Sequence, residues 1–421
     1  MDKIKIDYEK FSLENGLEVV LYQNKSFPTV AVNLWYMVGS ANEDPNKTGF
    51  AHLFEHMMFQ GSLNVPKEMH FKYIQEAGGT LNGSTSIDRT NYYETLPSDS
   101  LELALWLESD RMGYLLPALT EEKLENQKDV VMNERRQNYD NQPYGLAWEL
   151  LFSNLFPNDH PYHWPTIGWM EDIKNFNIED VKKFFLDYYT PNNASLVIAG
   201  NFDPNKAKYL AEKYFAPIEN NVKVKQLITE KIRLNESRKI VHEDNVQLTK
   251  LYLGWHSDKA YGKDDAALDI LSDILAGSKS SRLYKYLVHE LEIAQDVSAF
   301  QYSGKYNGIF FIILTLKPNS DIDNARLAIF KVIEELFEMG ISESELSRAK
   351  NVYKSSYIYS LQNLDNMANQ INNYNCFFNE PDSFDYDVSR YTRLTKADID
   401  QSARKYLKEH YIELDIVPKT E

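Results

Sequence analysis

The sequence has a single cysteine, Cys376, among its 421 residues. One cysteine cannot form a disulfide within the chain, and it excludes a structural zinc site built from four cysteines. Long apolar runs are also missing, because no stretch reaches the 18 residues that a membrane-spanning helix requires. The first residues lack the apolar core of an export signal. We therefore expect no membrane span and a cytoplasmic location, or a periplasmic one if an export signal has been removed.

Positively charged residues are fewer than negatively charged ones. The sequence has 45 Lys and Arg residues and 62 Asp and Glu residues, which gives a formal net charge of −17. Without a basic excess to neutralise phosphates, the composition argues against a nucleic-acid partner. An acidic surface favours solubility and would also attract basic peptides over long range. Hydrophobic residues make up 43% and aromatic residues 13% of the chain, which indicates packed cores and argues against disorder.

Alternating and helical hydrophobic patterns follow each other in a similar order in both halves of the chain. The first half predicts a helix at 48–60 between strands, and a second long helix that Thr120 can cap. The second half predicts a helix at 266–276 and a longer one from Asp321. The predicted strands lie at 17–23, 29–37, 90–96, 193–199, 251–255 and 308–315.

The two halves look like an internal repeat. Gly61-Ser62 follows the first key helix, and Gly277-Ser278 follows the second, 216 positions later. The polar stretch between them, without a clear period, is typical of a linker. We predict an α+β protein with an N-terminal domain at 1–217, a linker at 218–235 and a homologous C-terminal domain at 236–421.

The repeat indicates that only the first half carries chemistry. Aligning the halves places Leu268 at the position of His52 and Ser272 at the position of His56. Leu271 takes the place of Glu55 in the same alignment. The second domain would keep the helix but lack its polar cluster.

The segment from Gly49 to Phe59 contains His52, Glu55 and His56. Histidines at i and i+4 share one face of a helix, where two neutral imidazoles can bind one zinc ion. Glu55 lies beside His56, where a carboxylate can take a proton from a zinc-bound water whose pKa is lowered to about 7. The alternative is a coincidence on a surface helix. The apolar neighbours argue against it, because burying three polar groups is costly unless something binds them.

A catalytic zinc needs a third protein ligand and an open fourth position. Glu134, 78 residues after His56, is the best candidate, although spacing alone does not select it from 62 acidic residues. The order His-x-x-Glu-His, followed about 75–80 residues later by a helical Glu, resembles the pitrilysin and insulinase family of inverted zinc metallopeptidases. This resemblance implies that Glu134 is the third ligand and that each chain binds one Zn²⁺.

The resemblance extends over nearly the whole chain. Residues 78–85 are similar to the family's Gly-Gly-x-x-Asn-Ala-x-Thr segment. Further similar segments are Thr90-x-Tyr92, His160-Pro161-Tyr162, Ile167-Gly168 and Gly277 to Leu283. The family implies two homologous domains, each an antiparallel sheet with helices packed on one face. It also implies an extended peptide laid along a sheet edge beside the zinc, held by backbone hydrogen bonds.

The implied substrate-binding residues are Asn82, Gly83, Ser84 and Thr85, on the edge strand. A plain turn is the alternative for this segment, since Asn-Gly is a strong turn signal. Gln127 stands where family members often carry a second Glu, seven residues before the third ligand. An amide there can still support a ligand by a hydrogen bond but brings no charge.

A second departure concerns substrate activation. Self-sufficient members of the family carry an Arg and, seven residues later, a Tyr in the second half. Val288 and Gln295 occupy these positions and supply neither a cationic donor nor a phenol for an oxyanion. We therefore expect a heterodimer in which a related subunit without zinc supplies the Arg and Tyr. A homodimer or monomer with other donors, such as His289 or Tyr302, is the alternative.

These features favour a zinc endopeptidase that acts on oligopeptides or unfolded polypeptide segments. Two other functions stay open: a non-catalytic structural or binding subunit of a larger complex, and a zinc hydrolase that acts on non-peptide amides. The retained zinc residues favour catalysis, and the edge-strand segment favours peptides.

Overall fold

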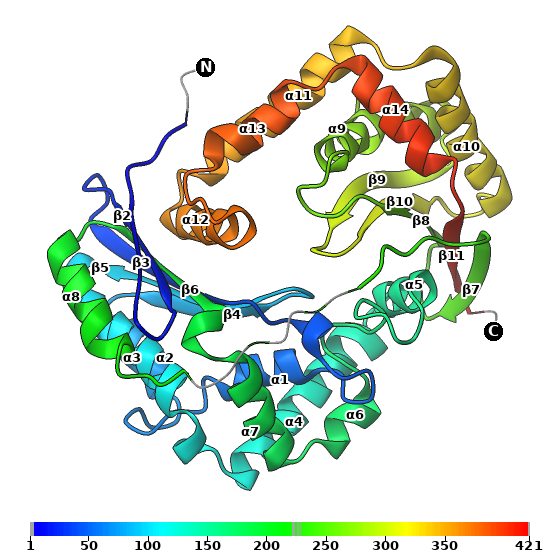
Figure 1. Cartoon of the computed structure of the whole chain (residues 1–421). Coiled ribbons are helices and arrows are strands. Elements are labelled where there is room, and N and C mark those ends of the chain that lie inside the picture. The colour runs from blue at the N-terminus through cyan, green and yellow to red at the C-terminus, as the bar shows by residue number, and fades with distance from the viewer. Residues whose placement is uncertain (1–3, 221–223, 225–226, 228, 420–421) are drawn as a thin grey trace. The chain divides into compact units, whose positions relative to one another are not determined.

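The computed structural model describes residues 4–220, 224, 227 and 229–419, and its contacts divide them into two compact units (Figure 1). The first unit comprises the described residues of Met1–Arg135, Trp164–Leu227 and Tyr357–Asp385. The second comprises those of Arg136–His163, Ile228–Ser356 and Tyr386–Glu421. Each unit thus takes one segment from the other half of the sequence. The predicted bounds 1–217, 218–235 and 236–421 follow chain order and stay a prediction, and part of that linker lies outside the described residues.

The first unit is built on a six-stranded sheet in the order β1-β2-β6-β3-β5-β4. Its pairs are antiparallel, except that β2 runs parallel to β6. The predicted strands at 17–23, 29–37, 90–96 and 193–199 are confirmed within a residue or two at their ends. The strands are β1 (Glu9–Ser12), β2 (Glu18–Gln23), β3 (Thr29–Tyr36), β4 (Thr80–Thr85), β5 (Thr90–Pro97) and β6 (Ala194–Gly200).

Helices cover both faces of this sheet. Helices α1, α3 and α8 pack on one face, and α12 lies on the other (Figure 1). The predicted cap is confirmed, because the backbone N–H of Lys123 donates to Thr120 Oγ1 at 3.3 Å. The helices are α1 (Phe50–Met57), α2 (Met69–Glu76), α3 (Leu101–Tyr114), α4 (Glu121–Arg135), α6 (Met170–Asn175), α7 (Ile178–Tyr188), α8 (Pro204–Phe215) and α12 (Leu364–Phe378).

The contact between α12 and the sheet combines buried apolar side chains with side-chain hydrogen bonds. Asn372 Nδ2 donates to the backbone oxygen of Asn33 at 2.8 Å, and Trp35 Nε1 donates to Asn369 Oδ1 at 3.0 Å. These bonds join α12 to β3 on the sheet face that lies away from α1. Helices were expected on one face of the sheet, and the structure adds α12 on the other face. This helix comes from a distant part of the sequence, so its position does not follow from the order of the neighbouring elements.

The second unit repeats the architecture with a five-stranded sheet in the order β7-β11-β8-β10-β9, in which only the β7–β11 pair is parallel. The predicted α+β class with two sheets is therefore confirmed. Its strands are β7 (Arg238–Asp244), β8 (Lys250–Ser257), β9 (Ala294–Ser303), β10 (Gly308–Leu316) and β11 (Tyr411–Pro418). The remaining helices are α5 (Ala147–Leu155), α9 (Asp265–Ala276), α10 (Ile322–Met339), α11 (Glu343–Ser360), α13 (Phe384–Thr392) and α14 (Lys396–Leu407).

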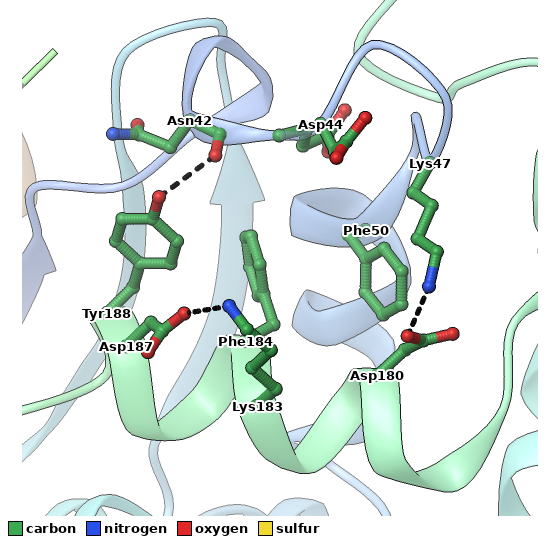
Figure 2. A pocket seen from close by; sticks show the side chains of 10 residues that line it. Asn42, Asp44, Lys47, Phe50, Asp180, Lys183, Phe184, Asp187 and Tyr188 are labelled. Atoms are coloured by element: carbon green, nitrogen blue, oxygen red, sulfur yellow. Dashed lines mark hydrogen bonds and ion pairs between the residues drawn. The ribbon is translucent and has the colours of Figure 1, made fainter. Parts of the chain in front are cut away.

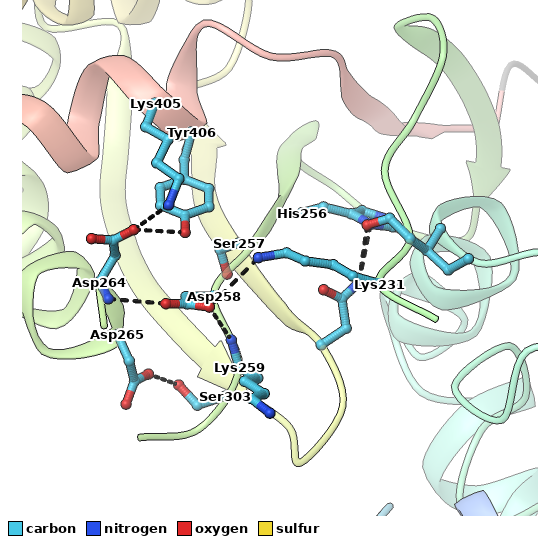
Figure 3. Close-up of polar contacts among 12 residues, drawn as sticks. Lys231, His256, Ser257, Asp258, Lys259, Asp264, Asp265, Ser303, Lys405 and Tyr406 are labelled. Atoms are coloured by element: carbon cyan, nitrogen blue, oxygen red, sulfur yellow. Dashed lines mark hydrogen bonds and ion pairs between the residues drawn. The ribbon is translucent and has the colours of Figure 1, made fainter. Parts of the chain in front are cut away.

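Helix α9 of the second unit is a structural element. A network of acidic and hydroxyl groups surrounds its N-terminus (Figure 3). Asp258 accepts the backbone N–H of Asp264 at 2.9 Å, and Asp264 accepts from Tyr406 at 3.0 Å. Further along, Leu268 and Leu271 are fully buried in the apolar core. The helix keeps its place in the fold through packing.

Among the described residues, no helix is both long and apolar enough to cross a bilayer.

Candidate metal centre

Helix α1 is amphipathic and presents its polar side chains on one face. Phe50, Leu53, Phe54 and Met57 are buried against the unit. His52, Glu55 and His56 stand on the other side and keep part of their surface exposed, as the i, i+4 spacing predicts. The two imidazole rings lie 4.9 Å apart between centroids.

The structure brings the three predicted metal ligands together. His52 Nε2 lies 3.7 Å from Glu134 Oε1, and His56 Nε2 lies 3.4 Å from Glu134 Oε2. One donor atom from each residue fits within a group no wider than 4.8 Å. Zinc bonds of about 2.0–2.2 Å at tetrahedral angles separate ligand atoms by roughly 3.3–3.6 Å. The donor set therefore fits a zinc ion in both chemistry and spacing.

The cluster is partly open to solvent. The side chains of His52, His56 and Glu134 are 15%, 25% and 32% exposed. Burial lowers the pKa of His52 to about 4, with a further lowering from His56. At neutral pH its imidazole is uncharged, which is the form that binds a metal. Partial exposure also leaves room for a water or substrate at a fourth position.

Glu55 is oriented by the edge strand. Thr85 Oγ1 donates to Glu55 Oε2 at 2.6 Å. A Cβ at Gly83 would lie 3.2 Å from Glu55 Oε1, so the strand backbone passes close to the second carboxylate oxygen. Burial raises the pKa of Glu55, while the hydrogen bond from Thr85 opposes this effect. Thr85 therefore holds this carboxylate, and its predicted contact with substrate stays a prediction.

Residues 82–85 lie in β4, at one end of the sheet (Figure 1). They form an extended strand, so the alternative of a turn at Asn82-Gly83 is wrong. β4 pairs only with β5, and Ser86 N donates to Arg89 O at 2.8 Å in the same register. By antiparallel alternation, the backbone groups of Leu81, Gly83 and Thr85 then point away from β5.

Side chains along β4 alternate between the two faces of the sheet. Gly83 and Thr85 face Glu55. Asn82 and Ser84 therefore face the other way. The backbone N–H of Gly83 donates to the side-chain Oδ1 of Asn82 at 2.9 Å, so this outward-facing donor has a local partner.

Gln127 lies on α4 and is 5% exposed. Its amide nitrogen donates to Asn126 Oδ1 at 2.9 Å. Within the described part of the chain, His52 Nδ1 is buried and has no hydrogen-bond partner. The supporting role of Gln127 stays a prediction, and the bond that the structure shows goes to its neighbour in the helix.

Two glycines bring the ligand-bearing helices together, a role that the sequence analysis missed. A Cβ at Gly49, where φ is +93°, would lie 2.5 Å from the backbone oxygen of Ile167. A Cβ at Gly168 would lie 2.4 Å from the Gly49 backbone. Arg135, next to Glu134, donates from Nη1 to the Gly168 oxygen at 2.9 Å. The 167–168 loop thus ties the start of α1 to the end of α4.

Glu43 was also missed, because nothing in its sequence context marks it. Its two carboxylate oxygens accept the backbone N–H groups of Gly49 and Ala51 at 2.9 and 2.7 Å. Those are orphan donors at the start of α1. Burial raises the pKa of Glu43 to about 8, and the two backbone bonds oppose that rise. The carboxyl group therefore caps the N-terminus of the helix that carries the candidate histidine ligands.

The loop that carries Glu43 is held to α7. A pocket of about 310 Å³ lies between the two. Figure 2 shows Phe50 and Phe184 among the side chains that line it. Lys47 forms an ion pair with Asp180, and Tyr188 donates to the backbone oxygen of Asn42 at 3.1 Å. These contacts support the Glu43 cap from the outer side.

Replacing Gly49 by Ala should destabilise the fold and weaken metal binding. A left-handed alanine costs about 1 kcal/mol, and the backbone clash with Ile167 raises the loss to roughly 3 kcal/mol or more. The control is Gly78→Ala, where φ is +80° and the nearest contact would be 3.8 Å away. Urea unfolding and zinc titration against a chelator should show a larger loss at Gly49 than at Gly78. Equal losses would contradict the close-approach role.

Glu43 should make stability depend on pH. Its folded pKa of about 8 exceeds the ordinary 4.5. The folded state therefore keeps a proton that the unfolded state releases, and stability falls as pH rises from about 4.5 to 8. With EDTA present, the unfolding free energy of the wild type relative to Glu43→Gln should fall by roughly 2–4 kcal/mol between pH 5.5 and 8.5. A difference that does not change with pH would refute this assignment.

Comparison with known proteins finds relatives in sequence and in structure. Residues 18–163 match the model of the insulinase family, peptidase family M16, and residues 175–353 match the model described as the peptidase M16 inactive domain. The zinc protease PqqE of Helicobacter pylori is 32% identical over 367 residues, which cover 86% of this chain and 82% of that protein. The crystal structure of a protease from Helicobacter pylori superposes with a TM-score of 0.92 at 29% identity, covering 99% of this chain and 100% of that chain.

A more distant relative is the probable mitochondrial-processing peptidase subunit beta of Arabidopsis thaliana. It is 24% identical over 370 residues, which cover 86% of this chain and 68% of that protein. Two of the relatives carry the name zinc protease. With a relative above 30% identity aligned over most of both chains, and with two family models that match successive segments, the chain belongs to the insulinase family of zinc proteases, peptidase family M16.

Proposed function

We propose that this chain is a zinc-dependent endopeptidase that hydrolyses oligopeptides or unfolded polypeptide segments. His52, His56 and Glu134 would hold one zinc ion, and Glu55 would act as the general base. The observation that carries the proposal is the convergence of three metal donors beside a carboxylate that is hydrogen-bonded to an edge strand. The relatives named zinc proteases support the same activity.

A zinc ion in this site would supply a Lewis acid that polarises the scissile carbonyl and activates water for attack at neutral pH. Glu55 would accept the proton from the attacking water and deliver it to the leaving amine. Thr85 keeps one carboxylate oxygen in place, and Glu55 Oε1 is left to face the reaction. No covalent intermediate with the protein is required.

The edge of β4 would bind the peptide as an added strand. The outward backbone groups of Leu81, Gly83 and Thr85 are the hydrogen-bonding positions. Asn82 currently occupies the Gly83 N–H, so its side chain would move aside when a peptide pairs there. Because backbone bonds ignore side-chain identity, this mode suits many extended sequences and excludes segments locked in a folded structure.

Replacing Glu55 by Gln should abolish peptide hydrolysis while zinc stays bound. The amide keeps the size of the side chain but cannot take a proton. Loss of at least about 100-fold in kcat is expected, given the usual contribution of a general base. Glu134→Gln is the matched variant and should lose zinc as well as activity, by metal analysis after dialysis. Normal turnover in Glu55→Gln would rule out the proposed role.

We further propose that the chain works as the zinc subunit of a heterodimer. Val288 lies in the π-helical turn Tyr284–Glu290 and packs against the core of the second unit, and Gln295 is exposed on β9. Neither side chain supplies the cationic donor or the phenol that the Arg and Tyr of self-sufficient members would bring to an oxyanion. One relative is by name a subunit, which supports a shared active site in which a second chain supplies the Arg and Tyr.

The isolated, zinc-loaded chain should therefore hydrolyse peptides weakly. Adding a related subunit with an Arg/Tyr pair should raise kcat/KM by about 100-fold or more, the usual effect of an oxyanion donor. Light scattering on the same samples separates monomer, homodimer and heterodimer. High activity from a monomer or homodimer would overturn the heterodimer proposal and leave the peptidase proposal intact.

A second candidate function is a non-catalytic structural or binding subunit. The description of the family model over 175–353 as an inactive domain favours it, although the metal cluster lies outside that segment. Zinc-dependent cleavage that stops on chelation would decide against it. The compartment proposed from the sequence is the cytoplasm, with the periplasm as the alternative.

A further inference from the structure

A polar pocket lies beside the proposed peptide strand. It has a volume of about 150 Å³ and is lined by residues of β3, β4, β5, the β4–β5 turn and the first turns of α12. Ser84 is its wall on β4, so the pocket opens on the sheet face away from Glu55. The residues that determine its chemistry are Asn33, Ser84, Arg89, Asn91, Asp365 and Asn369.

Arg89 is fixed by one of its nitrogens. Nη1 donates to the backbone oxygen of Ser84 at 3.0 Å and to Asn91 Oδ1 at 2.7 Å, and it also contacts Ser84 Oγ. The guanidinium carbon lies 5.3 Å from the ring centroid of Trp35. Across the described ranges, Nε and Nη2 have no hydrogen-bond partner. This pair of donors forms the planar fork that matches a carboxylate.

The amides around Arg89 also present donors. Asn91 Oδ1 accepts from Arg89, and Asn369 Oδ1 accepts from Trp35 Nε1 at 3.0 Å. Both of these partners can only donate, so they fix which end of each amide faces them. Asn91 Nδ2 then donates to Asn33 Oδ1 at 3.2 Å. The amide oxygens are used within the wall, and the Asn369 nitrogen is left as a donor.

Asp365 is the one carboxylate that lines the pocket within the described residues. One of its oxygens already accepts from Thr95 Oγ1. Burial lowers the pKa of Arg89, and the charges of Glu55 and Tyr93 oppose this lowering. Among the described residues no ion pair joins Asp365 to Arg89, so this carboxylate leaves the fork of Arg89 available.

A peptide paired with the outer edge of β4 would direct alternate side chains to the face of Ser84. We propose that this pocket is a specificity site that binds the carboxylate of an Asp or Glu side chain from that peptide, through Arg89. The inference rests on the proposed function, because it assigns a side-chain preference to the same strand. The proposed preference for an acidic side chain at one position runs against the attraction of basic peptides that the net charge of −17 predicts.

The test uses 12-residue peptides that differ only by Glu, Gln or Ala at one scanned position. At one position, the zinc-loaded chain should cleave the Glu peptide with a kcat/KM about tenfold above the Gln peptide, the size expected for a charge-assisted pair. Arg89→Gln should bring this ratio to about one, and Arg89→Lys should leave a smaller preference because it loses the fork. Asp365→Asn should raise the ratio, since it removes the opposing charge. Lys72→Gln on α2 is the charge-matched control and should not change it.

Peptide binding separates the two proposals. Glu55→Gln is titrated with the same labelled peptides, with zinc and with EDTA, by fluorescence polarisation. Tighter binding of the Glu peptide without any cleavage by the wild type would support this site and overturn the peptidase proposal. Cleavage with no preference for Glu at any position, or a preference that persists in Arg89→Gln, would overturn this inference alone. A chain that neither binds nor cleaves the peptides would overturn both.

Discussion

The metal cluster depends on a close backbone approach between two segments that are distant in sequence. Helices α1 and α4 carry the candidate ligands His56 and Glu134, 78 residues apart, and neither helix offers all three donors alone. Gly49 and Gly168 have no side chains, so their backbones can approach each other at a distance that a Cβ atom would prevent. Arg135 then joins α4 to the same loop. Because a zinc ion tolerates only a few tenths of an ångström in its bond lengths, this backbone contact decides whether the donors form one site.

Two carboxylates near the cluster, the buried Glu43 and the half-buried Glu55, differ in their hydrogen bonds and therefore in what they can do. Both Glu43 and Glu55 have their pKa raised by burial. Both carboxylate oxygens of Glu43 accept backbone N–H groups at the start of α1, so this carboxylate serves to hold the helix. Glu55 has one oxygen held by Thr85, and the other faces the Gly83 backbone. Only the second arrangement leaves a carboxylate that can exchange a proton with a substrate water.

Local pattern predicted the elements of the fold and the motif on α1. The strand and helix periods located β2, β3, β5 and β6, and the i, i+4 spacing placed His52 and His56 on one face. Glu134 required the family resemblance, because its distance from α1 in space depends on packing. The exchange of α12 and of the 136–163 segment was out of reach, since chain order carries no signal for which sheet a helix covers. Glu43 and the Arg89 pocket were missed for the same reason: their partners are set by tertiary contacts.

The two units show what the chemistry requires of one helix. In the second unit, α9 packs Leu268 and Leu271 into the core and is anchored by acidic groups at its start. In the first unit, the residues at the matching positions are polar. The side chains of His52 and His56 there are 15% and 25% exposed. A helix with such a face buries less apolar surface, so it must be held by other bonds. The Glu43 cap, the glycine contact and the hydrogen bond from Thr85 provide them. The contacts that hold α1 to the fold therefore also orient the candidate metal ligands and the side chain of Glu55.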